Sequence, residues 1–328
     1  MKLNRLSHFL SLMLAVVLIT SLMLAQDKKP TDPPMVPQKK DDEKLKLRTD
    51  LVSLIVSVTD SYNRSVIGLA QEHYEIYEDK VKQKIEHFTA KDEPVSLGIV
   101  FDVSGSMKEK IAKAKLSLQK FLDNTHDDDD MFLVAFNDRA RLVQDFTTSP
   151  EAILGKLMFT ETEGSTALYD ACYIGVEKLQ QGRHAKKVML IISDGQDNNS
   201  RYTYSELRNQ IKEADVIIYA IGIISPEEEL VGFGKSLLEE LARVTGGRAF
   251  FPFFFDDPIN IAKKNSPELD EILIRIALEI RHQYSIGYYP TNQKHDGSWR
   301  KVQVKIKPPK GLGRLYLKYK EKYKAPTS

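Results

Sequence analysis

Hydrophobic residues in the middle of this chain form short unbroken runs and do not alternate with polar residues. SLGIVF at 96–101, KVMLIIS at 187–193 and VIIYAIGI at 216–223 lack a two-residue period. Strands of this kind are usually buried on both faces, as in a parallel sheet covered by helices. Helix-like stretches separate the runs, so residues 94–283 are predicted to fold as an α/β domain, a doubly wound, mostly parallel sheet with helices on both faces.

Two further elements of this α/β domain are predicted from their patterns. MFLVAF at 131–136, the turn NDR and the run ARLVQDF favour a hairpin that adds an antiparallel edge strand. Near the end of the domain, PELDEILIRIALEIRHQ predicts a helix that packs one face on the sheet. Its apolar residues at helical spacing are Leu269, Ile272, Leu273, Ile276, Ala277 and Ile280.

The segments on either side of the α/β domain show a two-residue period. Valine and leucine stand at every second position over 52–58, with serine at two of the three positions between them, and apolar residues alternate with lysine and glutamine within 302–320. Neither flank alone holds enough strands to bury a face. We therefore expect residues 47–93 and 284–322 to form one small antiparallel β domain, into which the α/β domain is inserted, followed by a tail at 323–328.

The N-terminal 25 residues are predicted to be a secretory signal peptide, because Lys2 and Arg5 precede an apolar stretch that ends at Ala25. The alternative is an uncleaved membrane anchor with the rest of the chain facing outward. Residues 26–46 hold four prolines and dense mixed charge without apolar periodicity, which predicts a disordered linker. In either case the remainder of the chain is expected to be exported, as a secreted or periplasmic protein.

Composition limits the partners and the source of stability. The formal net charge is +1, and loss of Lys2 and Arg5 leaves 45 basic against 46 acidic residues, a net charge of −1. Bulk charge therefore argues against nucleic acid as a partner. Cys172 is the single cysteine, so no internal disulfide forms and the fold must depend on packing or on an ion. This thiol is expected to be a small buried helix residue.

Candidate metal ligands follow the first buried run, in DVSGSM at 102–107. Asp102, Ser104 and Ser106 are two residues apart, so an extended or gently curling loop can aim their three oxygens the same way. In open α/β sheets, ligands bind at the carboxyl ends of strands. Two more donors stand at other predicted loops, Thr166 in EGSTALYDA and Asp194 in LIISDGQDN. Five side-chain oxygens suit a hard cation such as Mg²⁺, with Mn²⁺ or Ca²⁺ as alternatives.

The combination of D-x-S-x-S, a later G-S-T and a still later S-D-G resembles the metal-ion-dependent adhesion site of von Willebrand factor type A domains, and the flanks resemble those of bacterial secreted VWFA-related proteins. The resemblance implies that Ser104, Ser106 and Thr166 contact the ion directly. Asp102 and Asp194 would do so directly or through water. It also implies mostly parallel strands wrapped by helices, and non-enzymatic adhesion or protein binding in which an acidic side chain of the partner completes the coordination shell.

The same residues are also compatible with two different roles. Strand-end Asp, Ser and Thr often cap the following helix. A different function class is a Mg²⁺-dependent phosphoryl-transfer enzyme with Asp102 as the nucleophile. Aspartyl phosphatases of the commonest type need a second Asp two residues on, however, and Ser104 stands there.

The last helix of the α/β domain, within 267–282, also has two possible roles. It is either a fixed wall of the fold, locked against the sheet by its apolar face, or an element that slides. The resemblance implies the second role, because in the related adhesion domains this helix slides when an acidic ligand engages the ion. Sliding would then pass the binding event to the β domain.

Four other patterns indicate ordinary surface or loop roles. DDDD at 127–130 is expected to be a solvated loop and not a calcium cluster. GFGKS at 232–236 lacks the first glycine of a phosphate-binding loop and is expected to be a loop entering a helix. Residues 300–328 carry ten Lys or Arg against one Glu, which indicates charged edge strands, with an anionic-surface patch as the alternative. No metal-binding spacing relates His126, His184, His282 and His295.

Overall fold

The computed structural model describes residues 51–224, 233–252 and 268–327. The predicted signal peptide at 1–25 and linker at 26–46 lie outside these residues. All of these described residues belong to one compact unit. None of the helices in the three described ranges is both long enough and apolar enough to cross a membrane.

The α/β domain is built on a six-stranded sheet with the order β10-β9-β8-β5-β6-β7. Only the pairing of β6 with β7 is antiparallel among these strands, so the predicted edge hairpin is confirmed. The chain moves from β5 to β6 on one side and returns to β8 on the other, which makes β5 the point where the strand order reverses. The strands are β5 Ser96–Asp102, β6 Asp130–Phe136, β7 Ala140–Thr147, β8 Lys187–Ser193, β9 Ile217–Gly222 and β10 Arg248–Phe250.

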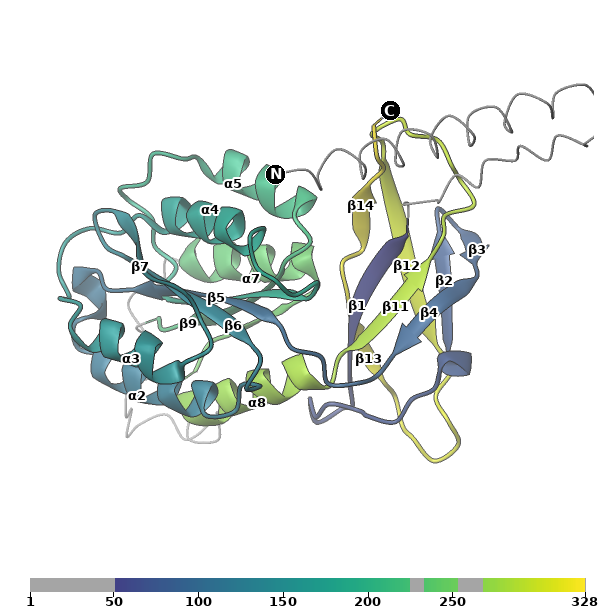
Figure 1. Ribbon diagram of the computed structural model, residues 1–328, viewed down its shortest axis with the longest axis horizontal. Helices are drawn as coiled ribbons and strands as arrows, with labels where there is room; N and C mark the ends of the chain where they lie inside the picture. Colours follow the sequence, from purple (N-terminus) through teal and green to yellow (C-terminus); the bar gives the residue numbers. More distant parts are fainter. Residues whose placement is uncertain (1–50, 225–232, 253–267, 328) are drawn as a thin grey trace, which may run out of the picture. The chain divides into compact units, whose positions relative to one another are not determined.

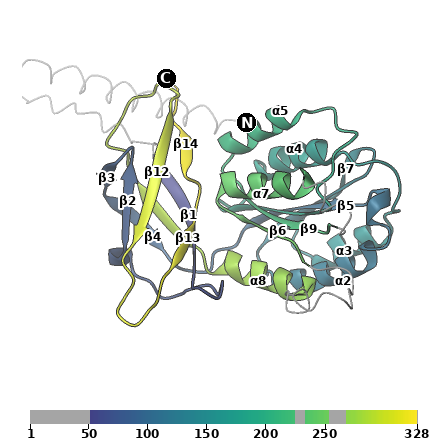
Figure 2. The same ribbon diagram turned by 180° about the vertical axis from the view of Figure 1, so that it is seen from behind.

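Helices cover both faces of this sheet, as predicted (Figure 1). One face carries α2 Ile111–Leu122, α3 Pro150–Met158 and α8 Leu269–Arg281. The other carries α4 Leu168–Leu179, α5 Tyr204–Glu213 and α7 Phe233–Thr245, and Figure 2 shows the same two layers from behind. The 3-10 helices in the described parts of the chain are η1 Gln71–His73 and η2 Gly105–Met107.

The unbroken apolar runs are explained by burial on both sides of the sheet. Every residue of β5 is buried. Consecutive residues of the strand pack into different hydrophobic cores, one on each face of the sheet. Ile99 belongs to the cluster under α2, α3 and α8, whereas Val100 belongs to the cluster under α4, α5 and α7. Both side chains are fully buried, and each such aliphatic side chain contributes about 1.5–3 kcal/mol relative to exposure.

The flanking segments pair with each other in a β domain of two four-stranded sheets, ordered β13-β1-β11-β4 and β14-β12-β2-β3. Antiparallel pairs β1–β11 and β2–β12 join the N-terminal flank to the C-terminal one, which confirms the predicted architecture. The exact domain boundaries remain predictions. The strands are β1 Val52–Thr59, β2 Tyr74–Glu78, β3 Val81–Gln83, β4 Ile85–Thr89, β11 Tyr284–Tyr288, β12 Trp299–Ile306, β13 Tyr316–Lys318 and β14 Lys322–Lys324.

The prediction that DDDD at 127–130 is a solvated loop is wrong for its last two residues. Asp129 and Asp130 are 0% and 6% exposed. Asp129 accepts hydrogen bonds from the backbone N–H of Val95 (2.8 Å) and of His126 (2.9 Å). Asp130 begins β6 and accepts from the Ser96 hydroxyl at 2.7 Å. These two carboxylates are buried because they satisfy polar groups around the start of β5, which a local charge pattern does not reveal.

Candidate metal centre

The predicted ligands cluster at the carboxyl ends of two adjacent strands. Asp102 is the last residue of β5, and Asp194 directly follows the last residue of β8. These strands are parallel neighbours, with Phe101 opposite Ile192. Because the strand order reverses at β5, the two acids stand at the topological switch point, where open α/β sheets bind their ligands.

A continuous series of hydrogen bonds connects four of the five predicted residues. The hydroxyl of Ser106 donates to Asp194 Oδ2 at 2.5 Å, and the Ser104 and Ser106 hydroxyl oxygens lie 3.1 Å apart. The backbone N–H of Ser104 donates to Asp102 Oδ1 at 2.9 Å. Residues 102–106 and 194 are far apart in sequence, so only the sheet brings their oxygens together.

Thr166, the fifth predicted residue, lies on a loop that contacts this cluster. The backbone N–H of Gly105 donates to the Gly164 carbonyl at 3.0 Å. Thr166 is 3% exposed, and its backbone N–H donates to Asn198 Oδ1 at 2.8 Å. Asn198 follows β8, so the loops after β5 and β8 hold the Thr166 loop from two sides.

Helix capping does not account for these side chains. Ser104 occupies the N-cap position of η2, but its side chain makes no capping hydrogen bond. The N-cap residues of α2 and α4 are Lys110 and Ala167, neither of which belongs to the cluster. Asp194 Oδ1 accepts the Gln196 N–H at 3.0 Å within the loop after β8, before any helix begins. Capping is therefore not the role of these residues.

The electrostatics of the cluster favour a positive charge nearby. Burial raises the pKa of Asp102 to about 6, and the neighbouring Asp194 carboxylate contributes to this rise because like charges repel. The Ser193 hydroxyl partly offsets this by donating to Asp102 Oδ2 at 2.7 Å. Ser193 was not among the predicted site residues. Its place directly before Asp194 in the S-D-G motif was the signal that could have identified it.

The donors suit a hard divalent cation. Two carboxylates and three hydroxyls supply oxygen only, which Mg²⁺, Mn²⁺ and Ca²⁺ prefer. Within the described parts of the chain, no group of three or more His, Cys, Asp or Glu side chains is arranged to hold a metal. This agrees with a hydroxyl-rich set, in which only two of the five donors are carboxylates.

Other candidate residues lie away from this cluster. Cys172 is fully buried in α4, and burial raises its pKa, which keeps the thiol protonated and unreactive, as predicted. In GFGKS at 232–236, the described residues from Phe233 onward already belong to helix α7 and not to a phosphate-binding loop. His126 and His184 are partly buried, and a ring nitrogen of each contacts the backbone of Asp128.

Comparison with known proteins finds one matching family model and one curated relative. Residues 97–264 match the family model of the von Willebrand factor type A domain. A curated but uncharacterized protein from Borreliella burgdorferi is 28% identical over 192 residues, 51% of this chain. The matched region spans 55% of that relative's length.

Solved structures with the same kind of domain are more distant. A von Willebrand factor type A protein from Catenulispora acidiphila has a TM-score of 0.45 and 16% identity, covering 85% of this chain and 74% of that chain. Proximal thread matrix protein 1 from the mussel byssus, with a zinc-occupied MIDAS motif, has a TM-score of 0.47 and 20% identity, covering 62% and 49%. At these scores the structures add no argument about function beyond the family match.

Proposed function

Because this chain belongs to the von Willebrand factor type A domain family, we propose that it is a non-enzymatic module that binds a protein partner through a divalent metal ion. The observation that carries the proposal is the convergence of Asp102, Ser104, Ser106 and Asp194 at one edge of the sheet, linked by hydrogen bonds of 2.5–3.1 Å. Adhesion or protein binding is the role that this family assignment fits.

The five predicted residues would coordinate the ion in two ways. Ser104, Ser106 and Thr166 would contact it directly, and Asp102 and Asp194 directly or through water. The two carboxylates balance the +2 charge of Mg²⁺, and the three hydroxyls add oxygen ligands without adding charge. When bound, the ion supplies a Lewis-acidic position that attracts an acidic side chain of the partner. The buried hydrogen bonds from Ser193 and from the Ser104 N–H orient Asp102 for this role.

A phosphoryl-transfer enzyme fits the described residues less well. Asp102 would be the nucleophile, yet it is 0% exposed and both its carboxylate oxygens accept hydrogen bonds, from Ser104 and Ser193. Ser104 also occupies the position of the expected general acid, and a hydroxyl does not serve as one near neutral pH. We therefore propose no catalytic step at this site.

The place of action is proposed to be outside the cytoplasm. This part of the proposal depends on the sequence of residues 1–25, in which two basic residues precede an apolar stretch. Cleavage would release a secreted or periplasmic protein, and retention of the segment would leave it anchored and facing outward. N-terminal sequencing of the protein from its native envelope and medium distinguishes the two outcomes.

Metal binding is tested by calorimetric titration of Mg²⁺ and Mn²⁺ into the purified protein. One ion per chain is expected for the wild type. Ser106→Ala and Asp102→Asn should each bind at least about tenfold more weakly, because each removes a donor or a negative charge. Ser165→Ala, next to Thr166 on the same loop, is the matched control and should stay within about twofold. Equal affinity in all four proteins would exclude the assigned site.

Partner binding is tested separately, with the immobilised protein and extract of the native envelope. Proteins retained in Mg²⁺ should be released by EDTA, and the Ser106→Ala protein should not retain them. Partners that bind equally with EDTA and to the variant would mean that binding does not pass through the metal. In that case, a metal ion detected by the titration would have a structural role and no role in partner binding.

A further inference from the structure

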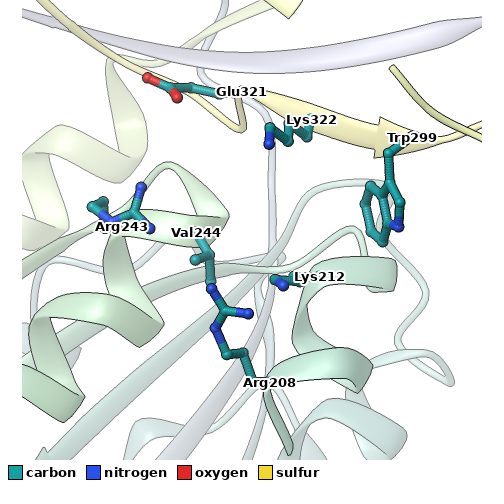
Figure 3. A pocket seen from close by; sticks show the side chains of 7 residues that line it. All are labelled: Arg208, Lys212, Arg243, Val244, Trp299, Glu321 and Lys322. Atoms are coloured by element: carbon teal, nitrogen blue, oxygen red, sulfur yellow. The ribbon is translucent and has the colours of Figure 1, made fainter. Parts of the chain in front are cut away.

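A cavity of about 290 Å³ lies between helices α5 and α7 of the α/β domain and the strands β12 and β14 of the β domain. Figure 3 shows side chains from all of these segments around a common space. None of them belongs to the candidate metal centre. The lining residues are Arg208, Lys212, Arg243, Val244, Trp299, Glu321 and Lys322.

The cavity carries excess positive charge. Four of its lining side chains are cationic and one, Glu321, is anionic. The two arginines share a further carboxylate, because Arg208 and Arg243 lie 3.1 Å and 2.7 Å from the two oxygens of Glu240. Counting that carboxylate leaves two positive charges uncompensated. Among the described residues, neither Lys212 nor Lys322 forms an ion pair with an acidic side chain.

An apolar surface borders these charges. Trp299 on β12 is the single tryptophan of the chain and is 43% exposed, although its neighbour Arg300 is buried. In Figure 3 its indole lies on the strand side of the cavity, and Val244 lies on the helix side. An exposed indole next to cationic side chains provides a flat surface for stacking beside donors for an oxyanion.

We propose that this cavity binds a small organic anion, with a phosphate or carboxylate group at Lys212 and Lys322 and a flat apolar group against Trp299. The uncompensated positive charge selects an anion, and the volume, at the lower end of ligand pockets, selects a small molecule. Since the lining comes from both domains, a bound anion would also connect them. The inference is independent of the metal centre and of the partner proposed above.

The single tryptophan makes the test specific to this cavity. Phenyl phosphate and benzoate, titrated in EDTA to remove metal ions, should each change the Trp299 fluorescence saturably, and their relative affinities identify the preferred oxyanion. Inorganic phosphate and neutral phenol should bind at least about tenfold more weakly, because phosphate lacks the flat apolar group and phenol lacks the oxyanion. Raising the salt concentration should weaken binding of the two aromatic anions. Calorimetry with the same compounds gives a second readout that does not depend on fluorescence.

Charge reversal distinguishes binding of the anion in this cavity from its nonspecific electrostatic attraction to the protein surface. Lys212→Glu combined with Lys322→Glu should weaken the better aromatic anion by about tenfold or more. The control, Lys310→Glu combined with Lys318→Glu, has the same net charge and changes two exposed lysines that do not line the cavity. Absence of saturable binding by both methods would overturn the proposal. So would equal binding of phenol, or equal loss of affinity in the control protein.

Discussion

Lys186 is a buried cation whose side chain contacts the C-terminal end of helix α8. It is 7% exposed, and its ammonium donates a hydrogen bond to the Ile280 carbonyl. Burial, and secondarily the nearby Arg281, lowers the pKa of Lys186 to about 8, although Asp92, Glu93 and Asp129 act in the opposite direction. Folding therefore favours the neutral amine of this residue, whereas the unfolded chain keeps the amine protonated up to its ordinary pKa of 10.5.

This difference predicts a pH-dependent stability. Below pH 8 both states are protonated and the folded state carries the full cost of the buried charge, about 3 kcal/mol. Between about pH 8 and pH 10 only the unfolded state holds the proton, so the free energy of unfolding should rise with pH. In Lys186→Met this rise should be absent, as measured by urea denaturation at a series of pH values. Lys187→Met, at the adjacent position, is the control, and an unchanged slope in Lys186→Met would contradict the prediction.

Asp129 and Asp130 show why single charged residues are difficult to predict. In the sequence they are indistinguishable from Asp127 and Asp128, which are exposed. Arg281, at the end of α8, contacts Asp129 from 152 positions away along the chain, and the Ser96 hydroxyl reaches Asp130 from 34 positions away. A run of four acids predicts solvation from composition alone, whereas burial here depends on distant partners that no local pattern contains.

Helix α8 is held to the rest of the α/β domain by polar contacts as well as by its apolar face. Glu279 is 2% exposed, and its carboxylate accepts from the Tyr219 hydroxyl at 2.9 Å and pairs with Arg248 at 3.2 Å. Near the other end, Asp270 accepts hydrogen bonds from Ser117 and Lys120 on α2. Sliding the helix would break these contacts together, so we expect α8 to stay fixed when the metal binds, and the sliding alternative stays open to test.

A cross-link tests whether α8 moves when the metal binds. Ser117 and Asp270 contact each other, so Ser117→Cys with Asp270→Cys is the cysteine pair to oxidise, and the buried Cys172 should not interfere. We expect the Mg²⁺ affinity of the oxidised and reduced forms of this protein to agree within about twofold. A difference of about fivefold or more would show that helix position and metal binding are coupled. Thiol counting confirms which form is present.

Strands and candidate site residues could be predicted from the sequence where the hydrophobic pattern agrees with the position of the residues in the sheet. The unbroken apolar runs became strands β5, β8 and β9 because both faces of each are covered by helices. The D-x-S-x-S spacing located the cluster because Asp102 ends a strand at the switch point of the sheet. The anion cavity was not predictable, because its lining spans residues 208 to 322 in segments without a motif.

At the scale of the whole unit, the two domains contact each other closely. Gln283, between α8 and β11, donates to the Ser57 hydroxyl of the β domain at 3.1 Å and to the Tyr219 hydroxyl of the α/β domain at 3.0 Å. Lys320 of the β domain donates to the Ala214 carbonyl at 2.8 Å. Gly246, with φ of +81°, packs against the backbone of Tyr319, so that an added Cβ would lie 2.3 Å from its carbonyl carbon.

These contacts predict that the domains unfold together. Trp299 lies on β12 of the β domain and lines the cavity shared with α5 and α7, whereas far-ultraviolet circular dichroism is dominated by the helices of the α/β domain, α2, α3, α4, α5, α7 and α8. In urea, the two signals of the wild type should therefore give one coincident transition. Transitions that separate in the wild type would mean that the interface contributes little to stability.

Two glycine substitutions isolate the contribution of the domain contact. Gly246 and Gly68 have nearly the same φ, +81° and +78°, but nothing lies within 4 Å of a Cβ added at Gly68. Alanine at either position costs about 1–2 kcal/mol through the backbone alone. Gly246→Ala must also displace the backbone of Tyr319, which should cost about 1–3 kcal/mol more and separate the fluorescence transition from the dichroism transition. Gly68→Ala should lower stability while the two transitions still coincide. If the two variants behave alike, the close approach at Gly246 does not join the domains, and the remaining contacts through Gln283 and Lys320 must do so.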